Sequence, residues 1–141
     1  MMLDIKRFKK SDLDEIELEY DFPAAERAAF CRGDNIVGVT ARKDEKIVAL
    51  GGVSILWPGV GEGWIMVSKH AHKCPRAVAR YADNAFDVII GASNLKRVQA
   101  SVHAEDHQAV RFARWMGFEN EGLMKKYGPD GSDYYRMARI S

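Results

Sequence analysis

The residue types best suited to binding an anion are concentrated in residues 68–76, here named the basic stretch. Its cationic or titratable side chains are Lys69, His70, His72, Lys73 and Arg76. Pro75 favours the first turn of a helix, so these charges would lie where a helix begins. Cationic side chains beside a helix N-terminus can hold a diphosphate through charge-assisted hydrogen bonds. The alternative is a set of solvated residues at an ordinary helix start.

The basic stretch also contains residue types that ligate metals, His70, His72 and Cys74, at alternate positions. Alternate spacing splays such side chains apart if the segment is extended. No fourth ligand is evident, although tetrahedral structural sites need four. We therefore expect no metal site.

The elements that must position the basic stretch follow from hydrophobic periodicity and turn residues. We expect a strand over 3–8, then a helix capped by Ser11 with Leu13, Ile16 and Tyr20 on its buried side. The remaining expected elements of this half are a helix over 23–31, strands over 35–42 and 46–56 joined at Asp44-Glu45, a glycine-rich loop over 58–63, a short strand over 64–67 and a helix over 75–90.

The C-terminal third alternates between strand and helix signals without a break. A strand over 97–103 leads into a helix cap at 103–106. Apolar residues then recur at helical spacing, namely Ala109, Phe112, Ala113 and Met116. Gly117 supplies the left-handed residue that ends the helix. Two strands, 121–124 and 133–137, follow across a turn at 129–131.

Composition indicates one soluble globular domain over residues 1–141, because 47% of residues are apolar and 29% are charged. The net charge of +1 creates no overall field toward nucleic acid or acidic lipid, so we expect neither partner. Two cysteines and the absence of a signal-length apolar run indicate a cytoplasmic protein. The three tryptophans should be walls of the core or of a cleft, since no basic groove accompanies them. They are Trp57, Trp64 and Trp115.

The C-terminal third resembles the GNAT superfamily of N-acetyltransferases, in the style of its ribosomal-protein acetyltransferase branch. The residues that carry the resemblance are the capped helix, Gly117-Phe118, Glu121-Gly122 and the final strand beginning Asp133-Tyr134. The order of elements also matches. The resemblance implies an α+β domain with a mixed, splayed sheet flanked by helices. Strands 64–67 and 97–103 should run parallel and diverge toward their C-terminal ends.

In that family acetyl-CoA lies between the two diverging strands, with its pyrophosphate on the loop that opens the next helix. The glycine-rich turn usual in that loop is absent here, and Lys69, Lys73 and Arg76 would replace it. A backbone N–H near Met66 or Val67 would serve as oxyanion donor. The family's capping Asn falls on Asp106, which keeps the cap but cannot donate an amide hydrogen bond.

The family's usual acid and base positions have changed, because the general-acid Tyr falls on Ala113 and the strand Glu falls on Ser101. We expect Glu62, placed before the fourth strand, or His103 to act as base. Tyr127 or Tyr134 would replace the missing phenol. Each has a structural alternative: a loop charge for Glu62, a surface residue for His103 and a core filler for Tyr134.

The leading prediction is an acetyl-CoA-dependent N-acetyltransferase in which a peptide or small-molecule amine attacks the thioester directly. The alternative is an inactive GNAT-fold protein. The chain also resembles small GNAT-like proteins of podoviruses, through residues 51–53, 67–69 and 127–133. That resemblance implies a virion component or a binder of a host protein, in the host cytoplasm. The C-terminal hairpin edges are candidate homodimer surfaces.

Overall fold

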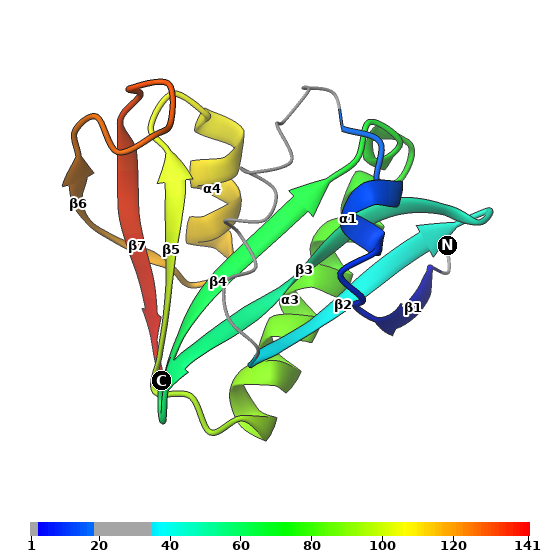
Figure 1. Ribbon diagram of the computed structural model, residues 1–141, viewed down its shortest axis with the longest axis horizontal. Coiled ribbons are helices and arrows are strands. Elements are labelled where there is room, and N and C mark those ends of the chain that lie inside the picture. Colours follow the sequence, from blue (N-terminus) through cyan, green and yellow to red (C-terminus); the bar gives the residue numbers. More distant parts are fainter. Residues whose placement is uncertain (1–2, 19–34) are drawn as a thin grey trace.

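The computed structural model describes residues 3–18 and 35–141, which form one seven-stranded mixed sheet with helices on both faces (Figure 1). The strand order is β1-β2-β3-β4-β5-β7-β6. The strands are β1 (Asp4–Arg7), β2 (Ile36–Lys43), β3 (Lys46–Trp57), β4 (Val60–Val67), β5 (Arg97–His103), β6 (Glu119–Met124) and β7 (Tyr134–Ile140). The helices are α1 (Asp12–Glu15), the 3₁₀ helix η1 (Ala71–Lys73), α3 (Pro75–Ala92) and α4 (His107–Trp115).

This order of elements confirms the sequence prediction wherever the chain is described. The helix expected over 23–31, and Tyr20, lie outside the described residues. Asp44 and Glu45 both have positive φ, at 52° and 69°, as a two-residue hairpin turn requires. Pro75 occupies the first turn of α3. Gly117 ends α4 at a φ of 93°, which confirms its predicted left-handed conformation.

The first helix is shorter than predicted. It ends at Glu15, because Ile16 already has extended backbone angles (φ −65°, ψ 133°). Ser11 is the N-cap residue of this helix, as predicted, but its side chain makes no capping hydrogen bond. The buried side predicted for this segment is confirmed for its described residues, since Leu13 and Ile16 are both in the core.

A buried carboxylate, Asp12, ties α1 to β2. It accepts hydrogen bonds from Thr40 Oγ1 at 2.7 Å, from the Lys9 N–H at 3.0 Å and from Arg42 Nη2 at 3.2 Å. Burial alone would raise the pKa of Asp12, but these hydrogen bonds and the charge of Arg42 outweigh it. The pKa therefore lies below its usual 3.8.

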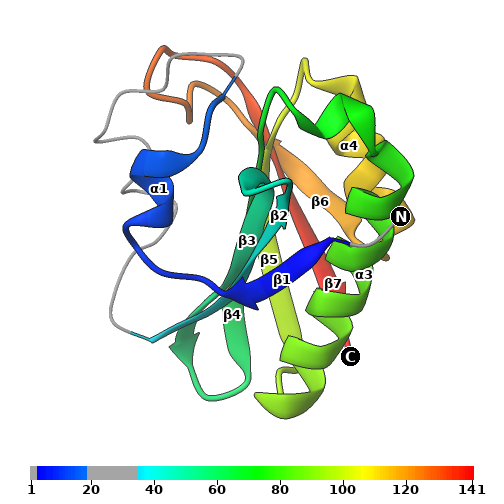
Figure 2. The ribbon, with the colours of Figure 1, turned by 90° about the vertical axis from the view of Figure 1, so that its right-hand side faces the viewer.

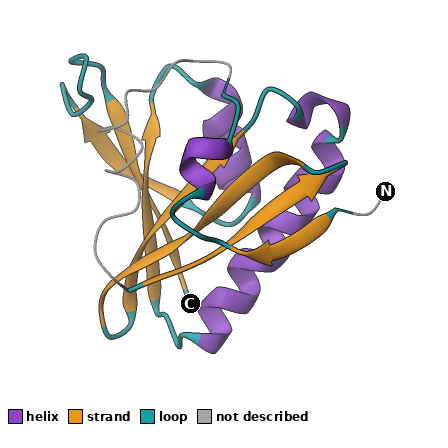
Figure 3. Cartoon of the chain, turned by 45° about the vertical axis from the view of Figure 1, so that its right-hand side comes forward, coloured by secondary structure: helices purple, strands orange, loops and turns teal. Residues whose placement is uncertain are grey.

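The helices divide the molecule into three layers. Helices α3 and α4 cover one face of the sheet and α1 lies on the other, as the side views show (Figure 2, Figure 3). We call these the α3–α4 face and the α1 face. Core residues of the α3–α4 face include Phe86, Ile89, Val98, Ala113 and Met137. Those of the α1 face are Leu13, Ile16, Ile47, Leu50, Trp64 and Met66. No described helix has the length and apolarity needed to span a membrane.

Strands β4 and β5 are parallel neighbours, and α3 connects them, as predicted. They pair only at their beginnings, where residues 60–62 lie in register with residues 97–99. Beyond this point β4 continues to Val67 and β5 to His103, but the two strands no longer pair with each other. Figure 1 shows the two halves of the sheet separating from there on. We call this feature the β4–β5 divergence.

The strand that leads into the divergence begins earlier than predicted. Residues 60–63 belong to β4 and not to a loop, and the turn before them is at Gly59, which has a φ of 91°. Gly61 and Gly63 signalled a loop, but here they allow close packing. A Cβ on Gly61 would lie 2.2 Å from Val53 Cγ1, and one on Gly63 would lie 3.0 Å from Val98 Cγ1.

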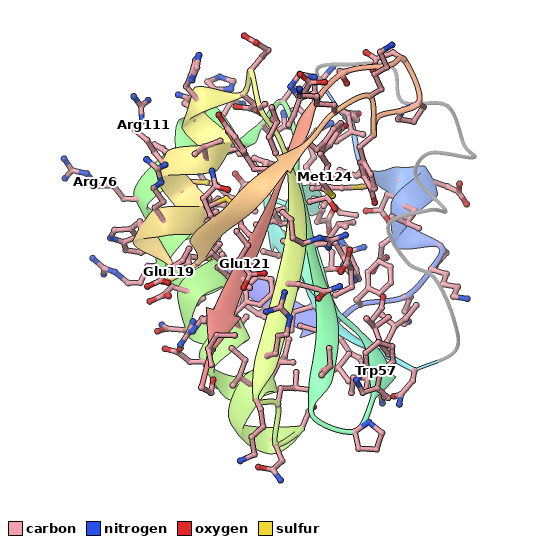
Figure 4. All side chains as sticks on the ribbon, turned by 90° about the vertical axis from the view of Figure 1, so that its left-hand side faces the viewer. Trp57, Arg76, Arg111, Glu119, Glu121 and Met124 are labelled. Carbon is pink, nitrogen blue, oxygen red and sulfur yellow. The ribbon has the colours of Figure 1, made fainter. Side chains whose placement is uncertain are left out.

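The C-terminal strands are also longer than predicted, since β6 starts at Glu119 and β7 runs to Ile140. Of the three tryptophans, Trp64 is in the core as expected. Trp57 and Trp115 are not in the core, since they are 61% and 60% exposed, because each lies at the end of its element. Figure 4 shows Trp57 at the rim of the sheet.

We expect Gly61→Ala to lower the free energy of unfolding by about 1–3 kcal/mol, because its Cβ must displace the branched, fully buried Val53 side chain. The matched control is Gly91→Ala in α3, where a Cβ meets no atom within 4 Å. That change should raise stability by up to about 1 kcal/mol. Urea unfolding of both variants measures the difference. Equal stability of Gly61→Ala and wild type would contradict the close packing.

We expect Asp12→Asn to destabilise the protein by roughly 2 kcal/mol at pH 7, because hydrogen bonds to a charged group are lost. A lowered folded-state pKa contributes stability above the unfolded pKa, and this contribution is lost as the pH falls through the folded value. The gap between wild type and variant should therefore shrink below about pH 4. Unfolding curves from pH 7 to pH 3 test this. A gap that widens in acid would refute the assignment.

Candidate functional site

Four basic side chains of the basic stretch, Lys69, His70, Lys73 and Arg76, divide into a pair that contacts an acidic residue and a pair without a partner among the described residues. Lys69 and His70 contact Glu17, which follows α1. Glu17 Oε2 hydrogen-bonds His70 Nε2 and lies 3.7 Å from Lys69 Nζ, and the Glu17 carbonyl accepts from the Lys69 N–H at 2.9 Å. The hydrogen bond with His70, followed by the charge of Lys46, holds the pKa of Glu17 below its usual 4.5. Lys69 and His70 therefore join the basic stretch to the segment after α1.

The second group, Lys73 and Arg76, is exposed and makes no ion pair or side-chain hydrogen bond with any described residue. Both flank the start of α3, where Cys74 is the N-cap and its side chain forms no capping bond. The first N–H groups of an 18-residue helix are thus available beside two cationic side chains. Figure 4 shows Arg76, and Arg111 from α4, extending into solvent on the side away from α1.

The remaining predicted cofactor residues lie at the ends of β4 and α4. Met66 is buried on the α1 face, and Val67, the last residue of β4, is 43% exposed. Asp106 is the N-cap of α4, and its Oδ1 accepts from the Ala109 N–H at 3.0 Å, which confirms the predicted cap. The cofactor roles of these residues stay predictions.

Glu62 lies within β4, so its placement before the strand was wrong. It is on the α1 face, because Trp64, two residues further along the strand, packs with the core beneath α1. Both Glu62 carboxylate oxygens accept from Nη1 of Arg136 at 3.1 Å. The carboxylate and the guanidinium are both about one-quarter exposed. Glu62 would have to loosen this bond to accept a proton from a substrate.

A second ion pair accompanies the first. Arg97 on β5 donates to both carboxylate oxygens of Glu121 on β6, at 2.6 and 3.0 Å. Hydrogen bonding to Glu121 raises the pKa of Arg97, and the same bond lowers the pKa of the Glu121 carboxyl. Arg136 also lowers the Glu121 pKa through its charge. Across the neighbouring strands β4, β5, β7 and β6 these groups therefore follow the order carboxylate, guanidinium, guanidinium, carboxylate.

The structure brings three of the predicted catalytic residues together at the C-terminal end of β5. The ring centroids of His103 and Tyr134 are 5.1 Å apart, and those of Tyr134 and Tyr127 are 5.4 Å apart. His103 Nδ1 accepts the Glu105 N–H at 3.1 Å. In the neutral imidazole the proton is then on Nε2, which makes that nitrogen a donor. Glu62 is not part of this group. The catalytic roles of all four residues stay predictions.

Sequence reasoning did not single out Arg136, Arg97 or Glu121. The sequence did contain a signal for Arg136. An arginine within an apolar strand needs a partner for its charge when that strand is central in a sheet. The identity of that partner depends on strand order, which places β7 between β5 and β6. Among the described residues, no group of three or more His, Cys, Asp or Glu side chains could hold a metal ion.

No protein-family model matches the sequence, and no curated protein matches it. Solved structures do match over nearly the whole chain. An acetyltransferase of the GNAT family from Streptococcus pneumoniae has 19% identity and a TM-score of 0.75, covering 99% of this chain and 100% of that chain. Ard1 from Thermoplasma volcanium has 19% identity and a TM-score of 0.77, covering 98% and 97%.

The ribosomal-protein-S18-alanine N-acetyltransferase from Escherichia coli is also similar, with 17% identity and a TM-score of 0.74 over 99% of this chain and 94% of that chain. At these identities the likeness concerns the fold. The chain has the GNAT fold, as the order of elements and the C-terminal residues predicted.

Proposed function

We propose that this protein is an acetyl-CoA-dependent N-acetyltransferase. The observation that carries the proposal is the β4–β5 divergence next to a helix start that bears two unpaired cations, Lys73 and Arg76. Past Glu62 and Gln99 the facing backbone edges of the two strands no longer pair with each other. Such edges can hydrogen-bond the amide groups of an extended ligand. The fold of the solved acetyltransferases supports the same reading.

Acetyl-CoA would suit this arrangement through the charge of its diphosphate and the amides of its pantetheine arm. Its diphosphate would be held by Lys73, Arg76 and the first free N–H groups of α3. Its pantetheine arm carries amides that could use the unpaired edges of β4 and β5. Lys69 is less suited to the diphosphate, because it is already engaged with Glu17. We therefore assign the diphosphate mainly to Lys73 and Arg76.

The reaction is a direct transfer. The neutral amine attacks the thioester carbonyl, a C–N bond forms, the C–S bond breaks, and the electron pair leaves on the CoA sulfur. The amine gives up one proton and the thiolate takes one, so no further reactant is needed. A backbone N–H at Met66 or Val67 would stabilise the oxyanion of the tetrahedral intermediate.

The side chains near the β4–β5 divergence are not equally suited to accept the proton of the amine or to donate a proton to the thiolate. In its neutral form His103 presents an N–H at Nε2, so it is better placed to donate a hydrogen bond than to remove a proton. Glu62 is a carboxylate, but Arg136 occupies both of its oxygens. We therefore assign Glu62 the role of base after loosening of the ion pair. Tyr134 or Tyr127 would be the acid at the thiolate.

The alternative is a catalytically inactive GNAT-fold protein that serves as a virion component or binds a host protein. It predicts no turnover of acetyl-CoA with any amine. The two proposals are separated by titration calorimetry with acetyl-CoA and desacetyl-CoA, followed by thioester consumption with a panel of peptide and small-molecule amines. A protein that neither binds nor consumes acetyl-CoA would refute the enzyme proposal.

We expect the double variant Lys73→Ala/Arg76→Ala to bind acetyl-CoA more weakly by about 2–4 kcal/mol, because hydrogen bonds from two cations to phosphate are lost. Wild-type affinity should fall as salt rises, and the salt dependence should be smaller in the variant. The matched control, Lys10→Ala/Lys96→Ala, removes the same charge from exposed lysines elsewhere. Equal weakening in both double variants would mean that only net charge matters.

We expect Glu62→Gln to lower kcat by about 100-fold or more, the typical contribution of a general base. His103→Ala, Tyr127→Phe and Tyr134→Phe are assayed beside it, and the acid should be the tyrosine whose loss has an effect of similar size. Thioester consumption under saturating acetyl-CoA measures each variant. If all four variants match the wild type, the fold assignment stands and these site assignments do not.

A further inference from the structure

The arginines in the described part of the chain divide into those with an acidic partner and those without one. The arginines that form ion pairs are Arg42, Arg97, Arg136 and Arg139. The arginines that form no ion pair or side-chain hydrogen bond with any described residue are Arg7, Arg76, Arg80, Arg111 and Arg114. All of the second group except Arg7 belong to α3 and α4.

These helical arginines share the outward side of one layer. Helices α3 and α4 cover the same face of the sheet (Figure 3), and all four side chains are exposed. Arg80 follows Arg76 by four residues and Arg114 follows Arg111 by three, so each pair lies on one side of its helix. Figure 4 shows Arg76 and Arg111 extending into solvent on the same side of the molecule.

An exposed aromatic ring accompanies these charges. Trp115 is 60% exposed and follows Arg111 by four residues on α4. Its ring centroid is 6.0 Å from that of Phe112, which packs against the core. The indole is therefore anchored through Phe112 while more than half of its surface stays in contact with solvent. We call the set of Arg76, Arg80, Arg111, Arg114 and Trp115 the outer basic surface.

Acidic side chains border this surface and do not interrupt it. Residues 69–82 and 107–118 contain no Asp or Glu, although the whole chain has 20. The acids directly beyond these segments are Asp83, Asp106 and Glu119. Neither α3 nor α4 has an acid in its first turn, where a negative charge would stabilise the helix. Positive charge is thus concentrated here even where helix stability opposes it.

The chemistry of these side chains restricts the partner. A guanidinium is planar and can donate two parallel hydrogen bonds to a phosphate. An exposed indole provides a flat surface on which a nucleobase can stack. An acidic peptide would use the arginines but not the indole, and a duplex keeps its bases stacked on each other. A single-stranded nucleic acid would use both kinds of side chain.

We propose that the outer basic surface binds a single-stranded nucleic acid, with the arginines on its phosphates and one base stacked on Trp115. The net charge of +1 predicts no such partner, but it averages this surface with the acidic remainder of the chain. Under the proposed function Arg76 also holds the diphosphate of acetyl-CoA, whereas the other three arginines and Trp115 stay free. The inference therefore does not depend on acetyltransferase activity.

The first test is fluorescence anisotropy of a labelled, unstructured RNA of about 12 nucleotides, titrated with protein at salt concentrations from about 50 to 200 mM. We expect Arg80→Ala/Arg111→Ala/Arg114→Ala to weaken binding at least 10-fold at the lowest salt. The slope of log K against log salt should become shallower by about 2, since each lost phosphate contact on a single strand contributes about 0.7.

The matched control is Arg7→Ala/Lys10→Ala/Lys96→Ala, which removes the same charge from exposed cations without an ion pair elsewhere in the described chain. Its affinity should stay within about 3-fold of the wild type, because general attraction between net charges is screened by salt. Equal weakening in the two triple variants would mean that net charge alone governs binding, and it would overturn the proposal.

A second variant tests the stacked base. Trp115→Leu should weaken binding of the single strand about 10-fold and change the affinity for a duplex of the same sequence less than 2-fold. The wild type should also lose tryptophan fluorescence when the single strand binds, and this quenching should be absent in Trp115→Leu. Circular dichroism checks that the variant is folded, as expected for a change at an exposed position.

Three further results would overturn the proposal. They are absence of RNA binding to the wild type at about 50 mM salt, equal affinity for poly-glutamate of the same charge, and complete displacement of the RNA by saturating acetyl-CoA. The last result would assign the outer basic surface to the cofactor. None of them counts against the acetyltransferase proposal, which is tested separately by thioester consumption.

Discussion

The divergence of β4 from β5 is the constraint on which the rest of the structure depends. Two parallel strands that pair at residues 60–62 and 97–99 and then separate leave backbone groups that the sheet does not satisfy. The paired region is held tightly, because Gly61 and Gly63 let β4 approach Val53 and Val98 without side chains between them. The two strands are therefore tightly paired at their beginnings and unpaired with each other beyond residues 62 and 99.

The two faces of the divergence differ in chemistry because different elements cover them. The α3–α4 face ends in a helix start with the free cations Lys73 and Arg76, which suits a phosphate-bearing ligand. The α1 face instead carries charges that are already paired, such as Glu62 with Arg136. Glu17 pairs with Lys69 and hydrogen-bonds His70, so the charge of Lys69 is already neutralised on the side of α1.

Local features of the sequence predicted the fold well, because proline, glycine and capping residues act within a few positions of themselves. Pro75 started α3, Asp106 capped α4 and Gly117 ended it. Features set by contacts between distant segments were not predictable. The Glu62–Arg136 pair joins residues 74 positions apart, and it depends on the order of β5 and β7 in the sheet. Gly61 was misread for the same reason, since its role is defined by Val53 on another strand.

Neither Glu62 nor His103 is free to act as a base, and this bears on which amines the proposed enzyme could acetylate. Glu62 is held by Arg136, and His103 presents its proton rather than its lone pair. Such a site works best on an amine that is already partly neutral. An α-amine with a pKa near 7.8 is about one-quarter neutral at pH 7.4, whereas an alkylamine with a pKa near 10.4 is only about 0.1% neutral. This difference of roughly 300-fold in the neutral fraction favours α-amines over alkylamines as acceptors. A base held in an ion pair would therefore limit the proposed enzyme more strictly on alkylamines than on α-amines.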